Sequence, residues 1–427
     1  MRDIVSGAVS EYFEEINVNP DNMGSISEPI AKSLFNIDKP TVYRVEGRWK
    51  GKFVSGLLPN RDYLRRMFGV KDDTDSFKIF LDAFKNAEAG LLKEDSFNEY
   101  FKLLDTSFES VMPPQIYSED GAPYMTASMF IACVNGICNA SIHRVMVVGA
   151  YDARVRVVPR HLYQLLKRRE PLPVAVVIGV HPIVLLAAAS SPPFGVFELG
   201  IAAKLLNGLR VCLTPNHSIP VPCGASLVIE GLLGGKYGPE GPFVDILGTI
   251  DNVRDQPLLK PISVYVNKVY EPLYHVIVQA SKEHMLFMGF PREASIYDVV
   301  SRVVPKVVNV RLSFGGCGWL HAIISIRKDV EGIAKNVILA AFAGHPSLKH
   351  VVVVDDDIDI DNPLSVEWAI ATRFQASKDL VVICDSRGSS LDPSSEDSLT
   401  CKVGVDATKP LGPGREDKFK RVAPWPM

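Results

Sequence analysis

Between residues 124 and 300 the chain carries a series of short apolar segments, rich in β-branched residues and separated by glycine and proline. The clearest are HRVMVVGA, ARVRVVP, VAVVIGVHP, LRVCLTP and PISVYVNKVY. Each is long enough for one strand and is bounded by residues that commonly end strands. Repeated at this spacing, such strands predict a barrel or sandwich with inserted helices. We therefore expect a β-rich domain over residues 123–300.

The flanking regions have different patterns. In residues 76–92, SFKIFLDAFKNAEAGLL, apolar residues recur at helical spacing, and we expect a helix-rich α+β domain over residues 1–122. A helix-like SIYDVVSRVVPKV closes the central part. After residue 305 a continuous apolar strand, VVVV, is followed by a helical SVEWAIATRF and a further strand, DLVVICD. Strand, helix and strand with apolar strands predict a parallel α/β domain over residues 301–427. The expected fold class is mixed α/β.

Composition and charge exclude several classes of protein. The formal net charge of −3 gives no basic excess of the kind that nucleic-acid surfaces carry. The longest apolar run, residues 174–189, is interrupted by His181 and Pro182 and is too short for a bilayer, so it predicts a buried strand, a turn and a helix. Residues 1–16 carry acids where a signal peptide has an apolar core. We expect a cytoplasmic protein with no nucleic-acid or membrane partner.

Seven cysteines are scattered through the chain without a CxxC pair. The nearest two, in CVNGIC, have a four-residue gap and no second pair close by. A disulfide framework or a zinc ribbon is therefore not expected, and we interpret the cysteines as free, mostly buried thiols.

Three short stretches carry polar residues beside predicted elements. Asn139 and Arg144 precede a strand, Arg160 and His161 end one, and Glu198 begins a helical stretch after a Pro/Gly turn. Each has an ordinary interpretation when taken alone: a cap, a surface imidazole, a first-turn acid. Together, an amide oxygen, an imidazole and a carboxylate form a mixed ligand set that suits Mn²⁺ or Mg²⁺. Arg144, with its planar fork of donors, suits a carboxylate partner.

The stretch KYGPEGPFVD, residues 236–245, places two acids five residues apart. Its prolines and glycines disfavour both a helix and a regular strand. Glu240 and Asp245 then belong either to a solvated turn or to a rigid loop that aims two carboxylates at a site. A second acidic stretch, residues 355–357, follows the VVVV strand. It could bind a hard cation, but accepting hydrogen bonds from nearby N–H groups is the more ordinary role for such acids.

Taken in order, these motifs resemble the UbiD family of decarboxylases, which use prenylated FMN. The resemblance rests on seven segments between residues 139 and 410: NASIHR, the histidine at 161, the glutamate before GIAAKLLNG, ASLVIEG, PEGPFVD, VVVVDDDIDIDNP with VEWAIATR, and KVGVDATKP. Any one of these motifs is weak, whereas the ordered set is specific. The resemblance implies a split β-barrel as the flavin-binding central domain and an oligomerisation role for the C-terminal domain.

The resemblance also assigns residues to a cofactor site. Asn139, His161 and Glu198 would hold Mn²⁺, with K⁺ as a further ion, against the phosphate of prenylated FMN. The full set of implied cofactor-binding residues is Asn139, Ser141, Ile142, His143, Arg144, Val157, Val158, Pro159, His161, Leu162 and Glu198.

The same resemblance implies a catalytic triad of Arg144, Glu240 and Asp245. Asp245 would donate a proton, Arg144 would hold the substrate carboxylate, and Glu240 would pair with Arg144 and orient it. Dividing the two acids in this way leaves Asp245 free to carry its proton near neutral pH.

The implied activity is non-oxidative decarboxylation of an α,β-unsaturated acid. One branch of the family acts on trans-anhydromevalonate 5-phosphate in an archaeal mevalonate pathway, giving isopentenyl phosphate, and this is the expected substrate. A 4-hydroxybenzoate-type aromatic acid is the alternative. A flavin-binding protein without activity and a metal-dependent hydrolase are more distant alternatives.

The expected partners are a flavin prenyltransferase that supplies the cofactor and further copies of the chain, as a homodimer or larger assembly. A phosphorylated substrate would need cations, for which His143, Arg160 and Lys236 are candidates. The chain departs from the family pattern at Ser141, His143, Ser226 and Val244.

Overall fold

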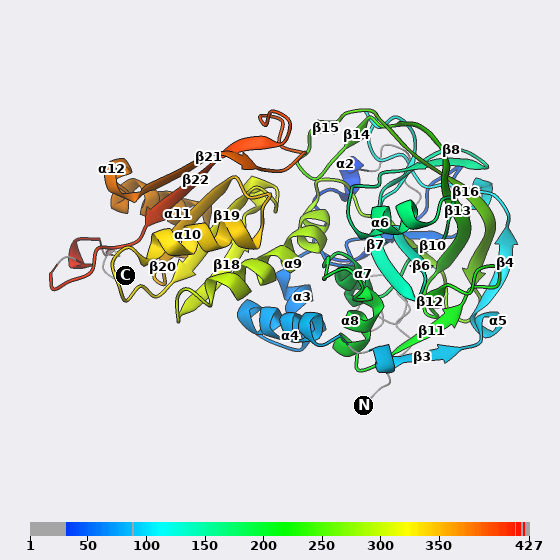
Figure 1. Cartoon of the computed structure of the whole chain (residues 1–427), viewed down its shortest axis with the longest axis horizontal. Helices are drawn as coiled ribbons and strands as arrows, with labels where there is room; N and C mark the ends of the chain where they lie inside the picture. The colour runs from blue at the N-terminus through cyan, green and yellow to red at the C-terminus, as the bar shows by residue number, and fades with distance from the viewer. Residues whose placement is uncertain (1–30, 88, 415, 420–421, 423–427) are drawn as a thin grey trace. The chain divides into compact units, whose positions relative to one another are not determined.

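The computed structural model describes residues 31–87, 89–414, 416–419 and 422 (Figure 1). The chain divides into two compact units. Unit 1 comprises Met1–Lys71 and Asp82–Met288, and unit 2 comprises Asp72–Leu81 and Gly289–Met427. Residues 1–16, in which we expect no signal peptide, lie outside the described residues. The division into three domains at residues 122 and 300 stays a prediction.

Unit 1 is organised around a nine-stranded sheet in the order β5-β8-β9-β16-β13-β10-β6-β7, with β4 also paired to β16. Every neighbouring pair in this order is antiparallel. The pairing does not close into a barrel among the described residues. The strands are β4 (Phe101–Asp105), β5 (Tyr124–Met125), β6 (Met129–Val134), β7 (Ile137–Ile142), β8 (Val145–Gly149), β9 (Asp152–Val155), β10 (Leu172–Ile178), β13 (Leu227–Glu240) and β16 (Arg254–Asn267).

Helices α6 (His161–Arg168), α7 (Pro182–Ala188) and α8 (Glu198–Leu205) accompany this sheet. The predicted strand, turn and helix over residues 174–189 are confirmed, because β10 and α7 are buried along their whole length. Pro182 at the first helical position and the His181 ring nitrogen that accepts the Ile183 N–H start α7. Helices α6 and α8 both pack against β7.

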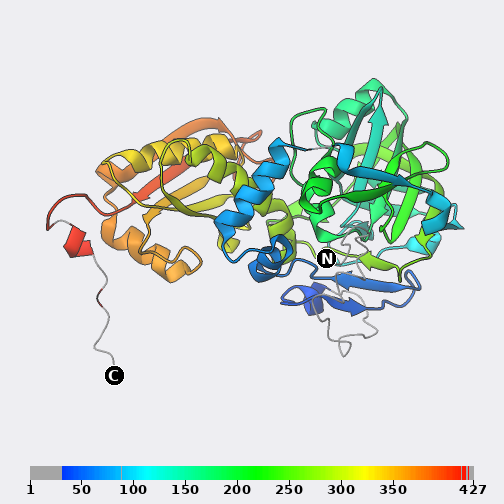
Figure 2. The ribbon, with the colours of Figure 1, turned by 90° about the horizontal axis from the view of Figure 1, so that it is seen from below.

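Two small sheets complete unit 1. In one, β1 (Thr41–Tyr43) pairs with β2 (Lys52–Ser55), which also pairs in parallel with β17 (Leu273–His275) (Figure 2). In the other, β11 (Leu209–Leu213) lies between β12 (Pro220–Pro222) and β3 (Leu92–Asp95). The remaining helices are α2 (Ala31–Leu34), α3 (Arg61–Phe68) and α5 (Phe97–Tyr100). The short pair β14 (Phe243–Val244) and β15 (Ile250–Asp251) forms a separate ribbon.

The expectation of free thiols is wrong for six of the seven cysteines. Disulfides join Cys133 to Cys138, Cys212 to Cys223 and Cys384 to Cys401, and Cys317 is not part of a disulfide. The first crosslinks the β6–β7 hairpin, where Asn135 and Gly136 both have positive φ. An Asn-Gly pair favours this tight turn and brings the flanking cysteines opposite each other.

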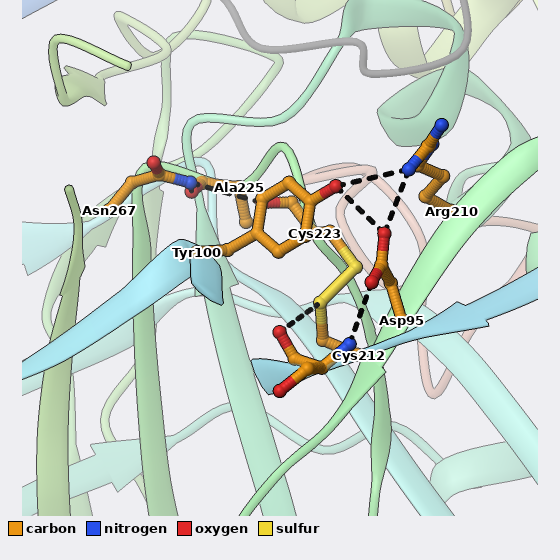
Figure 3. The surroundings of a disulfide bond; sticks show 8 residues. Asp95, Tyr100, Arg210, Cys212, Cys223, Ala225 and Asn267 are labelled. Carbon is orange, nitrogen blue, oxygen red and sulfur yellow. Dashed lines mark hydrogen bonds and ion pairs between the residues drawn. A yellow bond between two sulfur atoms is a disulfide. The ribbon is translucent and has the colours of Figure 1, made fainter. Parts of the chain in front are cut away.

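The second disulfide ties β11 to the segment that follows β12. Figure 3 shows its surroundings, where the Asp95 carboxylate accepts hydrogen bonds from Arg210 and Tyr100 at 2.8 and 2.9 Å. The Asn267 side-chain amide donates to the carbonyls of Cys223 and Ala225. The covalent link and these contacts together hold the small sheet on β16.

We expect the Cys212→Ser, Cys223→Ser double variant to lose roughly 2–4 kcal/mol of unfolding free energy, because the link closes a loop that is open in the unfolded chain. Urea unfolding measures this loss, and Cys317→Ser, which breaks no disulfide, is the matched control. Titration of thiols in the denatured, unreduced protein should give one per chain. Seven thiols and an unchanged midpoint would contradict the assignment.

Unit 2 contains a five-stranded sheet in the order β18-β19-β20-β22-β21. Its strands are β18 (Val307–Leu312), β19 (His321–Ile326), β20 (His350–Asp355), β21 (Leu380–Arg387) and β22 (Leu399–Ala407). Helices α10 (Ile333–Gly344) and α11 (Pro363–Arg373) pack on opposite faces (Figure 1), since Ile338 meets Gly404 while Val366 and Ala369 join the cluster that contains Val354. The predicted strand, helix and strand exist. However, β21 is an antiparallel edge strand, whereas β22 is the parallel neighbour of β20.

Helix α9 (Lys282–Val300) crosses the division between the units, as does α4 (Asp73–Lys85). The helix expected over residues 76–92 corresponds to α4, which ends at Lys85. The acids of residues 355–357 accept hydrogen bonds from nearby N–H groups: the Arg373 guanidinium donates to Asp355 and Asp357, and the Lys409 backbone N–H donates to Asp355. The more ordinary interpretation of these acids is thus confirmed. In the described part of the chain, no helix has both the length and the apolar character needed to cross a membrane.

Candidate active site

Arg144 lies at the centre of a buried group of carboxylates in unit 1. It is in the connection between β7 and β8, and its side chain is 8% exposed. The Arg144 Nε donates to Glu240 Oε1 at 2.9 Å, and Nη2 donates to Glu240 Oε2 at 3.0 Å. Glu240 is fully buried, at the last position of β13. This two-point contact fixes the plane of the guanidinium group.

Asp245 and Asp251 also bind Arg144. Arg144 Nη1 donates to Asp245 Oδ2 at 2.6 Å, and Nη2 donates to Asp251 Oδ2 at 2.7 Å. The structure therefore brings together all three residues of the expected triad. The expected division of roles gave only Glu240 to Arg144, whereas in the structure both Glu240 and Asp245 pair with Arg144. Asp251 is a third carboxylate that pairs with it.

The surroundings of Arg144 keep it charged. Burial lowers its pKa, but the Glu240 hydrogen bonds and the charges of Asp245 and Asp251 outweigh burial, so the pKa lies above its usual range. The Phe243 ring lies 4.4 Å from the Arg144 Cζ atom, a cation–π contact. The Tyr124 hydroxyl donates to Glu240 Oε1 at 2.9 Å, and burial followed by the Glu240 charge raises the pKa of Tyr124. Tyr124 thus serves as a neutral donor.

The PEGPFVD segment is more regular than we expected. Residues 236–240 continue β13 to Glu240, and residues 243–244 form β14, so only Gly241 and Pro242 interrupt the extended chain. Gly241 has φ +106°, and a Cβ on Gly121 would lie 2.5 Å from its carbonyl oxygen. Glycine at position 121 therefore allows the two backbones to approach closely, and glycine at position 241 allows the positive φ.

Val244, which departs from the family pattern, is buried and hydrogen-bonded through its backbone. Its N–H donates to Asp120 Oδ1 at 2.9 Å, and Gln279 donates to the other Asp120 oxygen at 2.8 Å. Burial raises the pKa of Asp120 to about 6, against the lowering effect of the hydrogen bonds from Val244 and Gln279. Asp120 therefore holds the residue next to Asp245 in place. We have no account of why the side chain at position 244 is valine.

The three expected metal ligands lie together. Asn139 is in β7, and His161 and Glu198 are the first residues of α6 and α8. Asn139 Nδ2 donates to Glu198 Oε1 at 2.7 Å, and His161 Nδ1 lies 3.8 Å from the same oxygen. Glu198 is 1% exposed and also accepts the Ala140 N–H at 2.7 Å.

The hydrogen bonds around Asn139 fit a bound cation. His143 Nδ1 contacts the Arg156 carbonyl at 2.9 Å, so it carries the ring proton and Nε2 must accept from the Ser141 hydroxyl. That hydroxyl has one hydrogen but faces two acceptors, His143 Nε2 and Asn139 Oδ1, each at 2.9 Å. Turning the Asn139 amide over would satisfy both, and would place Oδ1 beside the Glu198 carboxylate, where a divalent ion would hold the two oxygens.

The other expected cofactor residues are placed around these ligands. Val157 and Leu162 pack into the hydrophobic core, so only their backbone is available to a ligand. Ser141, Ile142 and Val158 are half-buried, and Pro159 is exposed.

Of the candidate cations for a substrate phosphate, His143 is excluded as a charged group. Burial lowers its pKa to about 4. Lys236 and Arg160 are both exposed. Burial lowers the pKa of Arg160.

Sequence reasoning missed Asp251, Arg254, Asp120 and Tyr124. Asp251 and Arg254 follow the PEGPFVD segment by only a few residues, but an isolated acid and an isolated base have no distinctive sequence signal. Asp120 and Tyr124 come from a Pro/Gly-rich connection more than a hundred residues earlier. Only the tertiary fold brings them to the site.

Comparison with known proteins identifies the same family as the sequence motifs. The Rift-related domain of the 3-octaprenyl-4-hydroxybenzoate carboxy-lyases matches residues 95–282, and the C-terminal domain of these proteins matches residues 285–407. Anhydromevalonate phosphate decarboxylase of Aeropyrum pernix is 45% identical over 381 residues, which cover 88% of this chain and 86% of that protein. The protein of the same name from Archaeoglobus fulgidus is 40% identical over 99% of this chain and 95% of its own length.

A solved structure is also similar along the whole chain. The UbiD-class enzyme HmfF from Pelotomaculum thermopropionicum, in complex with FMN, superimposes with a TM-score of 0.90 at 33% identity, covering 98% of this chain and 97% of that one. The family that the ordered motifs resemble is therefore also indicated by the two matched domains, by the relatives and by the fold. The chain belongs to the UbiD family of carboxy-lyases.

Proposed function

We propose that the chain decarboxylates trans-anhydromevalonate 5-phosphate to isopentenyl phosphate, using prenylated FMN. The observation that carries the reaction is Arg144, held by the buried Glu240 while its Nη1 atom faces Asp245. This arrangement offers a cation for a substrate carboxylate beside a carboxyl group that can deliver a proton. The substrate is proposed because the two relatives compared above carry the name anhydromevalonate phosphate decarboxylase.

The proposed reaction breaks the bond between the α-carbon and the carboxylate, and carbon dioxide leaves. The α-carbon then receives a proton, so no oxidant or reductant is consumed. Arg144 binds and orients the carboxylate before it leaves, and Asp245 delivers the proton to the same carbon. Bound prenylated FMN would supply the electron sink for the bonding pair, which no side chain can provide.

Asn139, His161 and Glu198 would hold the divalent ion, proposed to be Mn²⁺ with K⁺ as a further ion. We expect Glu198→Gln to lower Mn²⁺ content and affinity at least tenfold, roughly, because the change removes the only formal negative charge of the set. Metal analysis of the purified variant, and retention of flavin, measure the effect. Glu271→Gln is the control, since it alters an exposed carboxylate that pairs with Lys52. Equal metal content in both variants would contradict the assignment.

The proposed function is tested by producing the chain together with a flavin prenyltransferase, its proposed cofactor supplier. The purified protein would be incubated with trans-anhydromevalonate 5-phosphate, 4-hydroxybenzoate and a panel of unsaturated acids, and carbon dioxide release measured. Turnover of the phosphorylated acid supports the proposal, and turnover of 4-hydroxybenzoate alone supports the aromatic alternative. Bound prenylated flavin with no turnover of any acid would favour a non-catalytic flavin protein.

We also propose that the chain forms a homodimer or larger assembly and acts in the cytoplasm within isoprenoid biosynthesis. Light scattering of the purified protein tests the assembly. The three disulfides are compatible with a cytoplasmic location if the source organism is a hyperthermophile, in whose intracellular proteins disulfides are frequent. They are rare in the reducing cytosol of mesophiles.

A further inference from the structure

We propose that His284 is a substrate-binding residue, whose Nε2–H group donates a hydrogen bond to the second oxygen of the substrate carboxylate that Arg144 holds. The inference rests on the proposed function in one respect, namely that the ligand of Arg144 is a carboxylate. His284 lies in the first turn of α9, in the part of this helix that belongs to unit 1.

The hydrogen-bond donors of Arg144 show why a second group is needed. A guanidinium group has five N–H donors. Glu240 accepts one from Nε and one from Nη2, and Asp251 accepts the other from Nη2. Asp245 accepts one from Nη1, which leaves one N–H for a ligand. While Asp245 keeps its contact, Arg144 can therefore serve only one of the two oxygens of a carboxylate.

The backbone around His284 fixes which ring nitrogen carries the proton. The Ala280 N–H donates to His284 Nδ1 at 3.2 Å, so Nδ1 is an acceptor and the neutral ring has its proton on Nε2. Ala280 has φ +55°, an uncommon conformation for alanine, and the His284 N–H donates to Ser281 Oγ at 3.3 Å. Burial lowers the pKa of His284, which agrees with a neutral ring near pH 7. Nε2 is therefore a hydrogen-bond donor.

Nε2 of His284 is available to a ligand. It has no acceptor among the described residues, and the atom is not fully buried. The neighbouring Glu283 carboxylate is already used, because it accepts the backbone N–H groups of residues 56–58 and contacts the His275 ring. An N–H group that is left without an acceptor costs free energy on burial, so a ligand oxygen is the partner that this donor lacks.

A hydrogen-bonded bridge ties the His284 segment to the residue beside Asp245. The Asp120 carboxylate accepts the Val244 N–H at 2.9 Å with one oxygen and the Gln279 side-chain amide at 2.8 Å with the other. Gln279 comes just before α9, and Val244 comes just before Asp245. Asp120 thus holds the start of α9 against the strand that leads into Asp245.

A second contact brings the two segments together beyond this bridge. A Cβ on Gly248, in the turn that follows Asp245, would lie 3.8 Å from the Cβ of Ala280. The charges of Asp245 and Arg144 both act on the pKa of His284, the first raising it and the second lowering it. The imidazole therefore lies close to both charged groups of the expected carboxylate site.

A neutral donor suits a carboxylate that has to leave. The carboxylate loses its negative charge as carbon dioxide forms, so a second full cation would stabilise the bound acid more than the transition state. A neutral N–H group holds the second oxygen without adding such a charge. With one N–H from Arg144 and one from His284, both oxygens are held and the plane of the carboxylate is fixed.

Two substitutions at position 284 test this contact. His284→Phe keeps a planar ring but removes the Nε2 donor, whereas His284→Gln offers an amide N–H at a similar reach. Both lose Nδ1 as the acceptor of the Ala280 N–H, so the difference between them reports on Nε2. With the holoenzyme, His284→Phe should raise KM and lower kcat/KM roughly 10–100-fold, the range for one hydrogen bond to a charged group. His284→Gln should recover most of this loss.

Calorimetry with two unreactive ligands identifies the substrate group that His284 contacts. The saturated analogue of the phosphorylated acid keeps the carboxylate but has no double bond, and isopentenyl phosphate has no carboxylate. His284→Phe should weaken binding of the analogue to the holoenzyme roughly 10–100-fold and leave binding of isopentenyl phosphate unchanged. His350→Phe, the same change at an exposed histidine in β20, is the control and should alter neither.

Weaker binding of both ligands, equal binding of both, or a His284→Gln variant as impaired as His284→Phe would overturn the proposal. If 4-hydroxybenzoate is the acid turned over, then 4-hydroxybenzoate and phenol replace the two ligands. Calorimetry needs no turnover. If His284→Phe loses affinity for the carboxylate ligand alone but no acid is decarboxylated, the proposed function fails and the contact stands. An unmodified protein that binds neither acid would contradict both.

Discussion

Replacing Asp245 by asparagine is expected to lower kcat by a factor of about 10³, within the range usual for removing a positioned general acid. An amide oxygen can still accept the Arg144 Nη1 hydrogen bond that Asp245 Oδ2 accepts at 2.6 Å. The local structure should therefore persist while the transferable proton is lost. Product formation in single-turnover and steady-state assays measures the effect.

Two further variants sharpen this result. Asp245→Glu keeps a carboxyl group and should recover part of the activity, whereas Asp255→Asn should behave as the unmodified enzyme. Bound flavin and metal should be the same in all of them. Full turnover by Asp245→Asn would show that another group delivers the proton.

Replacing Arg144 by alanine is expected to abolish measurable decarboxylation and to lower the unfolding free energy by about 3–5 kcal/mol. The change leaves Glu240, which is fully buried, and Asp251 without their shared cation. The Tyr124 hydroxyl and Arg254 remain, but neither replaces the four hydrogen bonds that Arg144 donates to the carboxylates. Urea unfolding at pH 7 measures the loss.

The pH dependence of the unfolding free energy shows whether the Arg144→Ala variant is destabilised by unpaired buried charge or only by lost packing. Protonating the stranded carboxylates removes the buried negative charge, so the deficit relative to the unmodified protein should shrink in acid. Arg144→Lys restores a charge but not the two-point contact, and should recover stability more than activity. A deficit independent of pH would mean that the carboxylates are not held as described.

Local patterns predicted much of the fold. The five apolar segments between residues 124 and 300 correspond to β8, β9, β10, β11 and β16, because alternation and β-branched composition report directly on strands. The residues proposed as metal ligands and as the triad were identified from motif order, and the structure brings the members of each set together. The pairing of β21 could not be predicted, because its neighbour β22 comes later in the chain and strand order is a tertiary property.

The cysteines and Asp251 were missed for different reasons. Cys212 and Cys223 are eleven residues apart with no recognisable spacing, so only the β11–β12 pairing brings them together. Cys133 and Cys138 could have been paired from the Asn-Gly turn between them. Asp251 acts through contacts with Arg144 and Arg254, and no local pattern distinguishes it from a surface acid.

The long β13–β16 pairing has a consequence for which changes in length the chain can accept. Its register shifts between Leu233 and Tyr237, where Gly234 and Gly235 adopt positive φ, and beyond this irregularity Glu240 faces Arg254. Successive strand residues point to opposite sides, so deleting one residue here would turn Glu240 away from Arg144. The number of residues in this segment therefore determines the side of the sheet to which Glu240 points, although the segment resembles a surface turn whose length could vary. Substitutions within it should be accepted far more readily than single-residue insertions or deletions.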